Sequence, residues 1–380
     1  MATREARLPS VDLVRLVSIA VVFAVHLHAS GIVRLPEPGG LRELWLQFAR
    51  NGSYGVSLFF VVSGFVITRT IVRRERDLAR LDLREFYARR AGRILPLLLL
   101  TVALGALALS RVSPGSPRGD FCLRDPQARF DGAFWLSLST FSFNWLRIAR
   151  ESVAYGFGLH WDVLWSLAIE EQFYLVYPLA LRALGRRSRV TAMLFGVVAA
   201  GPLWRTGCAI LAPSSFLLAF TASFAAFDLI ALGALLGFFL ETHPGPASPG
   251  KGGLEAGLGA LGLAGALATF RYSSLDQPLD RVWGPSLLGL SLVLFLAVAI
   301  RRAWFVGRIF AALSAPGQWS YGGYLFHALT LFLLWPFLAG RSAVAAYGLY
   351  AATTLALAGV TYRFYETKAN RAIRRALRAA

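Results

Sequence analysis

Apolar runs of about 20 residues, separated by short polar or basic segments, recur along almost the whole chain. An α-helix needs this length to cross the hydrocarbon core of a bilayer. The pattern therefore predicts an all-α, polytopic integral membrane protein with about ten transmembrane helices. We expect these spans at residues 12–31, 54–72, 93–110, 159–182, 190–211, 216–240, 254–271, 283–300, 319–338 and 343–364.

Two other stretches interrupt this pattern. Residues 131–148 are apolar and aromatic, but Ser and Asn residues break the run, so we expect a re-entrant or interfacial segment. If this stretch crossed the membrane, the C-terminus would change sides. Residues 241–253 are rich in Gly and Pro and are expected to form a flexible connection between two groups of helices.

Basic segments indicate how the chain is oriented. The most basic one extends from Arg73 to Arg93, and others occur at residues 182–189, 301–308 and 368–378. Basic segments beside transmembrane helices stay on the cytoplasmic face of the membrane. We therefore expect both termini to be cytoplasmic.

The composition agrees with a membrane protein. Of the 380 residues, 56% are hydrophobic, and the mean hydropathy is +0.55. The net charge of +18 does not indicate nucleic-acid binding, because the basic residues flank apolar runs instead of forming one solvated face. The five histidines lack the spacing of metal ligands, so we expect no metal site. Cys122 and Cys208 are expected to be free thiols, although one bridge would form if both lay on the outer side.

The first predicted span contains ionisable residues, which are costly to bury in lipid. Arg15 and His26 are eleven residues apart, so they share one face of a helix. Their Cα atoms are about 16 Å apart along the helix axis. Asp12 lies near the same face, whereas His28 points elsewhere. Ionisable residues inside a membrane usually mark a functional path. The alternative is that His26 is a structural histidine and that Arg15 extends to the interface.

A second group of polar residues lies in the fourth predicted span, within residues 164–178. Ser166, Glu170 and Tyr174 share one helix face at i+4 spacing, and Glu171 lies about 100° away. A carboxylate in a membrane needs a partner, such as a histidine or an arginine. The alternative is a structural ion pair that orients the bundle.

The third group lies at the inner end of the third span, in residues 85–96. Arg90 and Arg93 are three residues apart and share a helix face. A pair of guanidinium groups suits phosphate, which arginine binds in a bidentate manner. The alternatives are a topology signal and a contact with lipid headgroups.

Two further stretches contain small or polar residues. Gly55, Ser57, Ser63 and Gly64 in the second span allow close helix approach, and we interpret them mainly as packing residues. Residues 318–331 overlap the ninth predicted span. Within them, His327 lies seven residues after Ser320 and almost on the same helix face, so it is either a site residue or a structural one.

Together these stretches resemble the acyltransferase type 3 family of integral-membrane O-acyltransferases, whose members include O-antigen and other sugar O-acetylases. The resemblance covers nearly the whole chain, and the motifs occur in the family order. Some relatives carry a C-terminal soluble domain; here we expect a single membrane-embedded domain over residues 1–380. The motifs are R/K-x10-H at Arg15 and His26, GVxLFFVxSGF at residues 55–65, FYxRRxxRIxP at residues 86–96, WSLxxEEQFYLxYP at residues 165–178 and SYxxYLxH at residues 320–327.

The resemblance implies transfer of an acyl group from cytosolic acyl-CoA to a hydroxyl group. Acetyl-CoA is the expected co-substrate, with no tightly bound cofactor. Arg15, Arg90 and Arg93 would bind the phosphates of the donor. His26 would be either the general base or the carrier of the acyl group, and Glu170 would orient its imidazole. Supporting residues are expected to be Glu171, Ser166, Ser320, Tyr321 and His327, with Ser166 and Tyr321 as candidate oxyanion donors.

The resemblance does not identify the acceptor. A sugar, a glycan, a lipid-linked sugar and a secondary metabolite are all consistent with it, and the oligomeric state stays open. We expect a multi-pass protein of the bacterial inner membrane. The main alternative is a transporter or flippase of a lipid-linked or acylated substrate, because intramembrane His, Glu and Arg residues also build proton relays and substrate paths.

Overall fold

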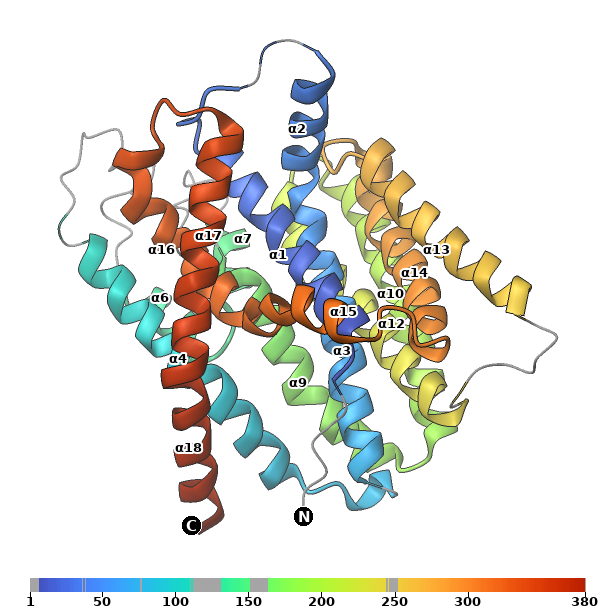
Figure 1. Ribbon diagram of the computed structural model, residues 1–380. Coiled ribbons are helices and arrows are strands. Elements are labelled where there is room, and N and C mark those ends of the chain that lie inside the picture. Colours follow the sequence, from blue (N-terminus) through green and yellow to red (C-terminus); the bar gives the residue numbers. More distant parts are fainter. Residues whose placement is uncertain are drawn as a thin grey trace.

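The computed structural model describes residues 7–35, 37, 39–75, 77–109, 111, 131–150, 163–243, 245 and 252–379. All regular elements in this part of the chain are helices, as predicted (Figure 1). The α-helices are α1 (Pro9–Ala29), α2 (Gly40–Arg50), α3 (Tyr54–Arg74), α4 (Leu83–Leu109), α6 (Gly132–Ser139), α7 (Phe143–Ala149), α9 (Leu164–Leu184), α10 (Arg187–Leu211), α11 (Phe216–Thr221), α12 (Ser223–Thr242), α13 (Gly252–Tyr272), α14 (Pro278–Arg301), α15 (Arg308–Leu313), α16 (Ser320–Leu338), α17 (Ala343–Thr361) and α18 (Thr367–Ala379).

Within the described residues, each predicted span is helical to within a few residues. Nine helical segments of the described chain are long and apolar enough to cross a membrane. The fourth predicted span, at residues 159–182, is not one of these nine and corresponds to α9, which has 21 residues but is more polar because it contains Glu170, Glu171 and Gln172. The fold is therefore a polytopic helical bundle of the predicted kind.

The structure adds detail to three of the predicted elements. Helix α4 begins at Leu83, ten residues before the predicted span, because the basic segment is helical too. The predicted span at 216–240 is broken at Ala222, so that α11 and α12 are separate helices. Residues 131–148 form two short helices, α6 and α7, of 8 and 7 residues. Neither is long enough to cross a bilayer, and the predicted connection at 241–253 lies mostly outside the described residues.

Helix α3 lies at the centre of the bundle and packs against α1, α12 and α14 (Figure 1). The closest approach is between α3 and α12. A Cβ atom on Gly64 would overlap with the carbonyl oxygen of Ile230, and one on Gly233 would overlap with that of Val61. Small residues let helix backbones approach closely in membranes. The prediction that Gly64 is a packing residue is therefore confirmed.

The outer surface of the bundle is apolar over much of its area, as expected for a lipid-facing surface. Helix α13 lies at the edge of the bundle in Figure 1, and only 11% of its membrane-length window is buried. Large exposed apolar side chains on the peripheral helices include Leu203, Ile210, Leu211, Leu254, Leu261 and Leu267.

A fully buried ion pair joins three helices far from any predicted site residue. The guanidinium of Arg205, on α10, lies 2.8 Å from the Asp228 carboxylate on α12, and both side chains are fully buried. Arg205 also donates to the carbonyl of Val282 (2.8 Å), and Ser286 on α14 donates to Asp228 (2.7 Å). Because the hydrogen bonds of both charged groups are made within the protein, this pair acts as a structural connection between α10, α12 and α14.

Replacing Asp228 with Ala should destabilise the protein by about 3–5 kcal/mol, because it leaves the Arg205 charge buried without its partner. The Arg205→Met, Asp228→Leu double variant should lose less stability, since no charge remains. Thermal unfolding of the detergent-solubilised protein measures both changes. Arg80→Ala, which removes an exposed ion pair with Asp77, is the control and should have almost no effect. An unchanged midpoint for Asp228→Ala would contradict the structural role.

Candidate active site

One cavity between α1, α3, α4, α9 and α16 brings together most of the predicted site residues. We call it the arginine cavity. It lies inside the bundle and is bounded by the central helix α3 on one side. The predicted residues that line it are Arg15, Arg90, Arg93, Ser166, Glu170, Ser320 and Tyr321.

Helix geometry explains why these side chains meet. Arg90 and Arg93 project from the same face of α4, because they are three residues apart. Ser166, Glu170 and Tyr174 all line the cavity, so the predicted stripe on α9 is confirmed. Leu167 also lines the cavity, whereas Glu171 is not among the described residues that line it.

The arginines of the cavity differ in how they are paired. Arg15 lies 3.4 Å from the carboxylate of Asp12, which also accepts a 2.9 Å contact from Arg7. The Arg90 guanidinium stacks over the ring of Tyr174, with 4.2 Å from Cζ to the ring centroid. Neither Arg90 nor Arg93 forms an ion pair with a described residue. These two guanidinium groups therefore keep donors for an anionic ligand.

The carboxylates near these arginines are buried. Glu170 lines the cavity beside Ser63, whose hydroxyl bonds to that of Tyr174, and it lies in the field of Arg90 and Arg93. Glu171 is 7% exposed, and its Oε1 has no hydrogen-bond partner among the described residues. Both carboxylates interact electrostatically with Arg90 and Arg93, which partly balance their charge.

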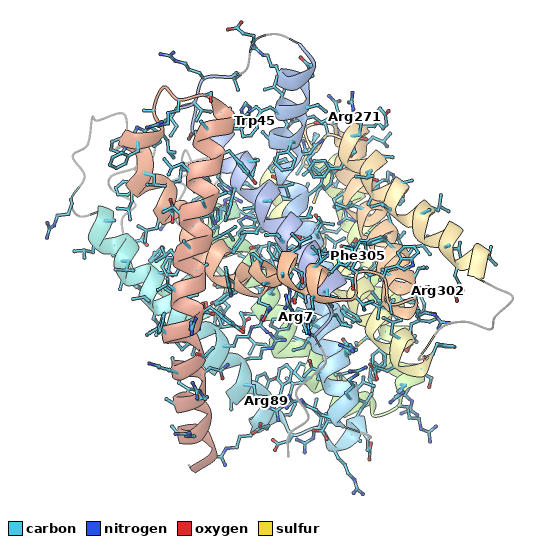
Figure 2. The ribbon with its side chains drawn as sticks, in the orientation of Figure 1. Arg7, Trp45, Arg89, Arg271, Arg302 and Phe305 are labelled. Atoms are coloured by element: carbon cyan, nitrogen blue, oxygen red, sulfur yellow. The ribbon has the colours of Figure 1, made fainter. Side chains whose placement is uncertain are left out.

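Two larger cavities adjoin the arginine cavity, and Arg93 lines all three. The first vestibule has a volume of about 580 Å³ and is lined by five arginines and one carboxylate among the described residues. The second vestibule has a volume of about 200 Å³ and lies between α3, α4 and α18. In Figure 2, Arg7 and Arg89, from the two vestibules, lie in the lower half of the view, and Arg271 lies at the opposite end.

The vestibules contain arginines that the sequence analysis did not assign to the site. Arg7, Arg69 and Arg73 line the first vestibule together with Arg15 and Arg93. Arg69 and Arg73 also contact the Glu241 carboxylate, at 3.4 and 2.6 Å. Basic residues at helix ends are common in membrane proteins, where they set the orientation of the chain. The spacing of these arginines alone therefore did not distinguish site residues from a topology signal.

Two aromatic side chains form the inner end of the arginine cavity. We call Phe59 and Tyr324 the aromatic wall. Their ring centroids are 6.0 Å apart in an edge-to-face arrangement. The Tyr324 hydroxyl donates to the Val163 carbonyl (2.9 Å) and accepts from Ser166 (2.6 Å). Tyr324 is therefore held in place across two helices.

A pair of histidines lies beyond the aromatic wall. The rings of His26 and His327 are 4.6 Å apart, and the ring of His327 is 5.4 Å from that of Tyr324. Nδ1 of His26 lies 2.8 Å from the carbonyl oxygen of Val22, which can only accept a hydrogen bond. In the neutral imidazole the proton is therefore on Nδ1, and Nε2 is the basic nitrogen.

The comparison with known proteins can now be set beside this geometry. Residues 8–363 match the model of a family described as "Acyltransferase domain". The chain belongs to this acyltransferase family. The resemblance found in the sequence motifs is thereby confirmed. No solved structure matches the chain.

Relatives of this acyltransferase-family chain carry names that refer to O-acetylation. The peptidoglycan O-acetyltransferase OatA of Listeria monocytogenes is 27% identical over 386 residues, which cover 96% of this chain and 56% of OatA. A Bacillus subtilis protein, YrhL, provisionally named a peptidoglycan O-acetyltransferase, is 32% identical over 37% of this chain and 21% of its own length. A protein of Staphylococcus aureus strain COL, provisionally named an O-acetyltransferase, is 28% identical over 50% of this chain and 28% of its own length. The chain thus spans about half, or less, of the relatives it matches.

For this family member, the structure differs from the expected placement of His26. We expected His26 to open onto the same cavity as Arg15, but it is not among the described residues that line the arginine cavity. Tyr324 and His327 lie between them, because α16 rises by about 10 Å from Ser320 at the arginines to His327 at the histidine pair.

The expected partner of His26 also differs. Nδ1 of His26 contacts the Val22 carbonyl, whereas Glu170 lies with the arginines. The candidate oxyanion donors line the cavity, but the Tyr321 hydroxyl donates to the Ile94 carbonyl at 2.9 Å. The Ser166 hydroxyl donates a hydrogen bond to the Tyr324 hydroxyl.

Only one of the two cysteines lies in the described part of the chain, and it does not line the arginine cavity. Cys208 is a free, buried thiol on α10, and Cys122 lies outside the described residues.

Proposed function

We propose that the chain is an integral-membrane O-acyltransferase of the inner cell membrane. It transfers an acyl group, acetyl by default, from acyl-CoA to a hydroxyl group of a sugar, a glycan or a related acceptor. The observation that carries this proposal is the arginine cavity, which joins intramembrane arginines to two arginine-lined vestibules. Membership of the acyltransferase family supports it.

The donor would bind with its phosphates at the arginines and its acyl end inside the bundle. Arg93 lines all three cavities, Arg90 lines the arginine cavity and the second vestibule, and neither forms an ion pair with a described residue. Guanidinium groups bind phosphate oxygens in bidentate fashion and are over-represented at phosphate sites. Glu170 and Glu171 would hold the arginine pair in position while the donor is absent. The vestibules would then face the cytosol, where acyl-CoA is found.

His26 would act through Nε2, since Nδ1 is bonded to Val22. In a direct route, Nε2 accepts the proton of the acceptor hydroxyl, whose oxygen attacks the thioester carbonyl carbon. The carbon–sulfur bond breaks, and the CoA thiolate takes the proton from the imidazolium. In a two-step route, Nε2 attacks the thioester carbonyl carbon, the carbon–sulfur bond breaks and CoA leaves as the thiolate. The acceptor oxygen then attacks the acyl carbon, the bond from that carbon to Nε2 breaks, and the hydroxyl proton passes to Nε2 and on to the thiolate. Both routes require Tyr324 to turn aside, because its ring lies between the cavity and His327.

The acceptor is proposed from the names of the relatives. The Listeria relative is named a peptidoglycan O-acetyltransferase, and a glycan hydroxyl is therefore the first acceptor class to test. Neutral sugar hydroxyls need a base to become nucleophilic at physiological pH, which is the role given to His26.

Membranes containing the protein should transfer label from radioactive acetyl-CoA to an endogenous acceptor. The labelled product is then isolated and identified by mass spectrometry, with membranes that lack the protein as the control. A flippase would move its substrate without forming this covalent product. Absence of any labelled acceptor, with the protein present and folded, would contradict the proposed function.

His26→Ala should lower the rate of acyl transfer by about 100-fold or more, because a general base contributes about 10²–10⁴-fold. The initial rate of labelled product formation measures the change, and size-exclusion profiles in detergent show whether the variant folds. The control is His243→Ala, since His243 is exposed and lines none of the three cavities. A folded His26→Ala variant with most of its activity would remove His26 from the mechanism.

Replacing both Arg90 and Arg93 with Ala should raise the KM for acetyl-CoA by about 10- to 100-fold, because each charge-assisted hydrogen bond contributes about 1.5–3 kcal/mol. The dependence of the initial rate on acetyl-CoA concentration measures this. Arg84→Ala is a matched control on the same helix, since Arg84 is exposed and lines none of the three cavities. The phosphate-binding role is wrong if the KM of the double variant equals that of the control.

A further inference from the structure

The lining of the arginine cavity changes from charged to apolar along α3. Val66 lines all three cavities and marks the mouth. Ser63, one turn further in, bonds to Tyr174 and lies at the level of Glu170. Phe59 and Val56 line the inner end. From Val66 to Val56 the helix rises by about 15 Å, which gives the depth of the cavity.

The inner end is apolar and firmly packed. Phe60 lines it and is 2% exposed, and its ring lies edge-to-face on Trp165 with 6.1 Å between centroids. Leu167 and Val56 complete the apolar lining beside the aromatic wall. Dense packing of this kind leaves little freedom to widen the space.

The cavity is also small. Its volume is about 90 Å³, against about 580 and 200 Å³ for the two vestibules. A thioester whose phosphates are held at the mouth brings its acyl group toward the inner end. Room remains there for a short acyl group, and each further methylene would meet the Phe59 ring.

We propose that Phe59 is the residue that sets the acyl chain length, by closing the inner end of the cavity to acyl groups longer than two or three carbons. This inference rests on the proposed acyltransferase function and names its donor class. Phe59 suits the role better than Tyr324, because Tyr324 has to move for the acyl group to reach His26. Phe59 lies on the central helix α3, and its backbone is held by the packing of α3 against α1, α12 and α14.

The expected preference for short acyl groups follows from the space that the Phe59 ring occupies. One extra methylene in a fitted apolar pocket changes discrimination by about 10- to 200-fold. The unaltered protein should therefore use acetyl-CoA with a kcat/KM at least tenfold above that for butyryl-CoA. Removal of the Phe59 ring opens space for the two additional carbons of the butyryl group.

The experiment compares labelled acetyl-CoA, butyryl-CoA and hexanoyl-CoA in membrane vesicles that contain the endogenous acceptors. In Phe59→Ala, the ratio of kcat/KM for butyryl-CoA to that for acetyl-CoA should rise at least tenfold. Phe59→Leu should give a smaller rise in the same direction and serves if the Ala variant fails to fold. Tyr324→Phe, which keeps the ring and removes its hydroxyl, should leave the ratio within about twofold, since the space is unchanged.

Phe48→Ala is the matched control. Phe48 is a half-buried phenylalanine on α2 that contacts Phe270 and Tyr347 and lines none of the three cavities. Its ratio should equal that of the unaltered protein. Unchanged ratios in folded Phe59→Ala and Phe59→Leu, or a preference of the unaltered protein for hexanoyl-CoA, would overturn the inference while leaving acyl transfer intact. Absence of transfer from every acyl-CoA would instead overturn the proposed function.

Discussion

A guanidinium group inside a bilayer has to be paired with a carboxylate or kept in contact with water or an anion, and this constraint shapes the whole protein. The chain satisfies it in two different ways. Arg205 is enclosed with Asp228, and both side chains are fully buried and bonded within the protein. Arg90 and Arg93 lie instead beside cavities and form no ion pair with a described residue. The enclosed ion pair contributes to the structure, whereas the two arginines beside the cavities are available to a charged ligand.

The site residues follow one another in a fixed order through the bundle, beginning at Arg90 and Arg93. Charged groups lie at the mouth of the cavity, the aromatic wall lies further in, and the histidine pair lies beyond it. A donor with phosphates at one end and an apolar acyl group at the other matches this order. The wall separates the proposed donor site from His26, so that a thioester meets the base only after Tyr324 moves. Such a separation would protect the thioester from premature attack.

The sequence predicted much of this site, because helical spacing is read directly from residue numbers. The arginine pair on α4 and the stripe from Ser166 to Tyr174 on α9 both line the cavity, as their spacing indicated. The same reasoning did not reveal that Nδ1 of His26 contacts the Val22 carbonyl while Glu170 lies near the arginines. Helical periodicity places two residues on one face of their own helix, but it does not say which neighbouring helix intrudes between them.

The sequence by itself determined the helical membrane fold, the approximate spans and the family, because apolar length and local motifs are properties of consecutive residues. Only the tertiary structure decided which charges are enclosed and which are open. It also placed Tyr324 and Phe59, from α16 and α3, against each other. Contacts between helices far apart in the chain depend on how whole helices pack, and no short stretch of sequence contains that information.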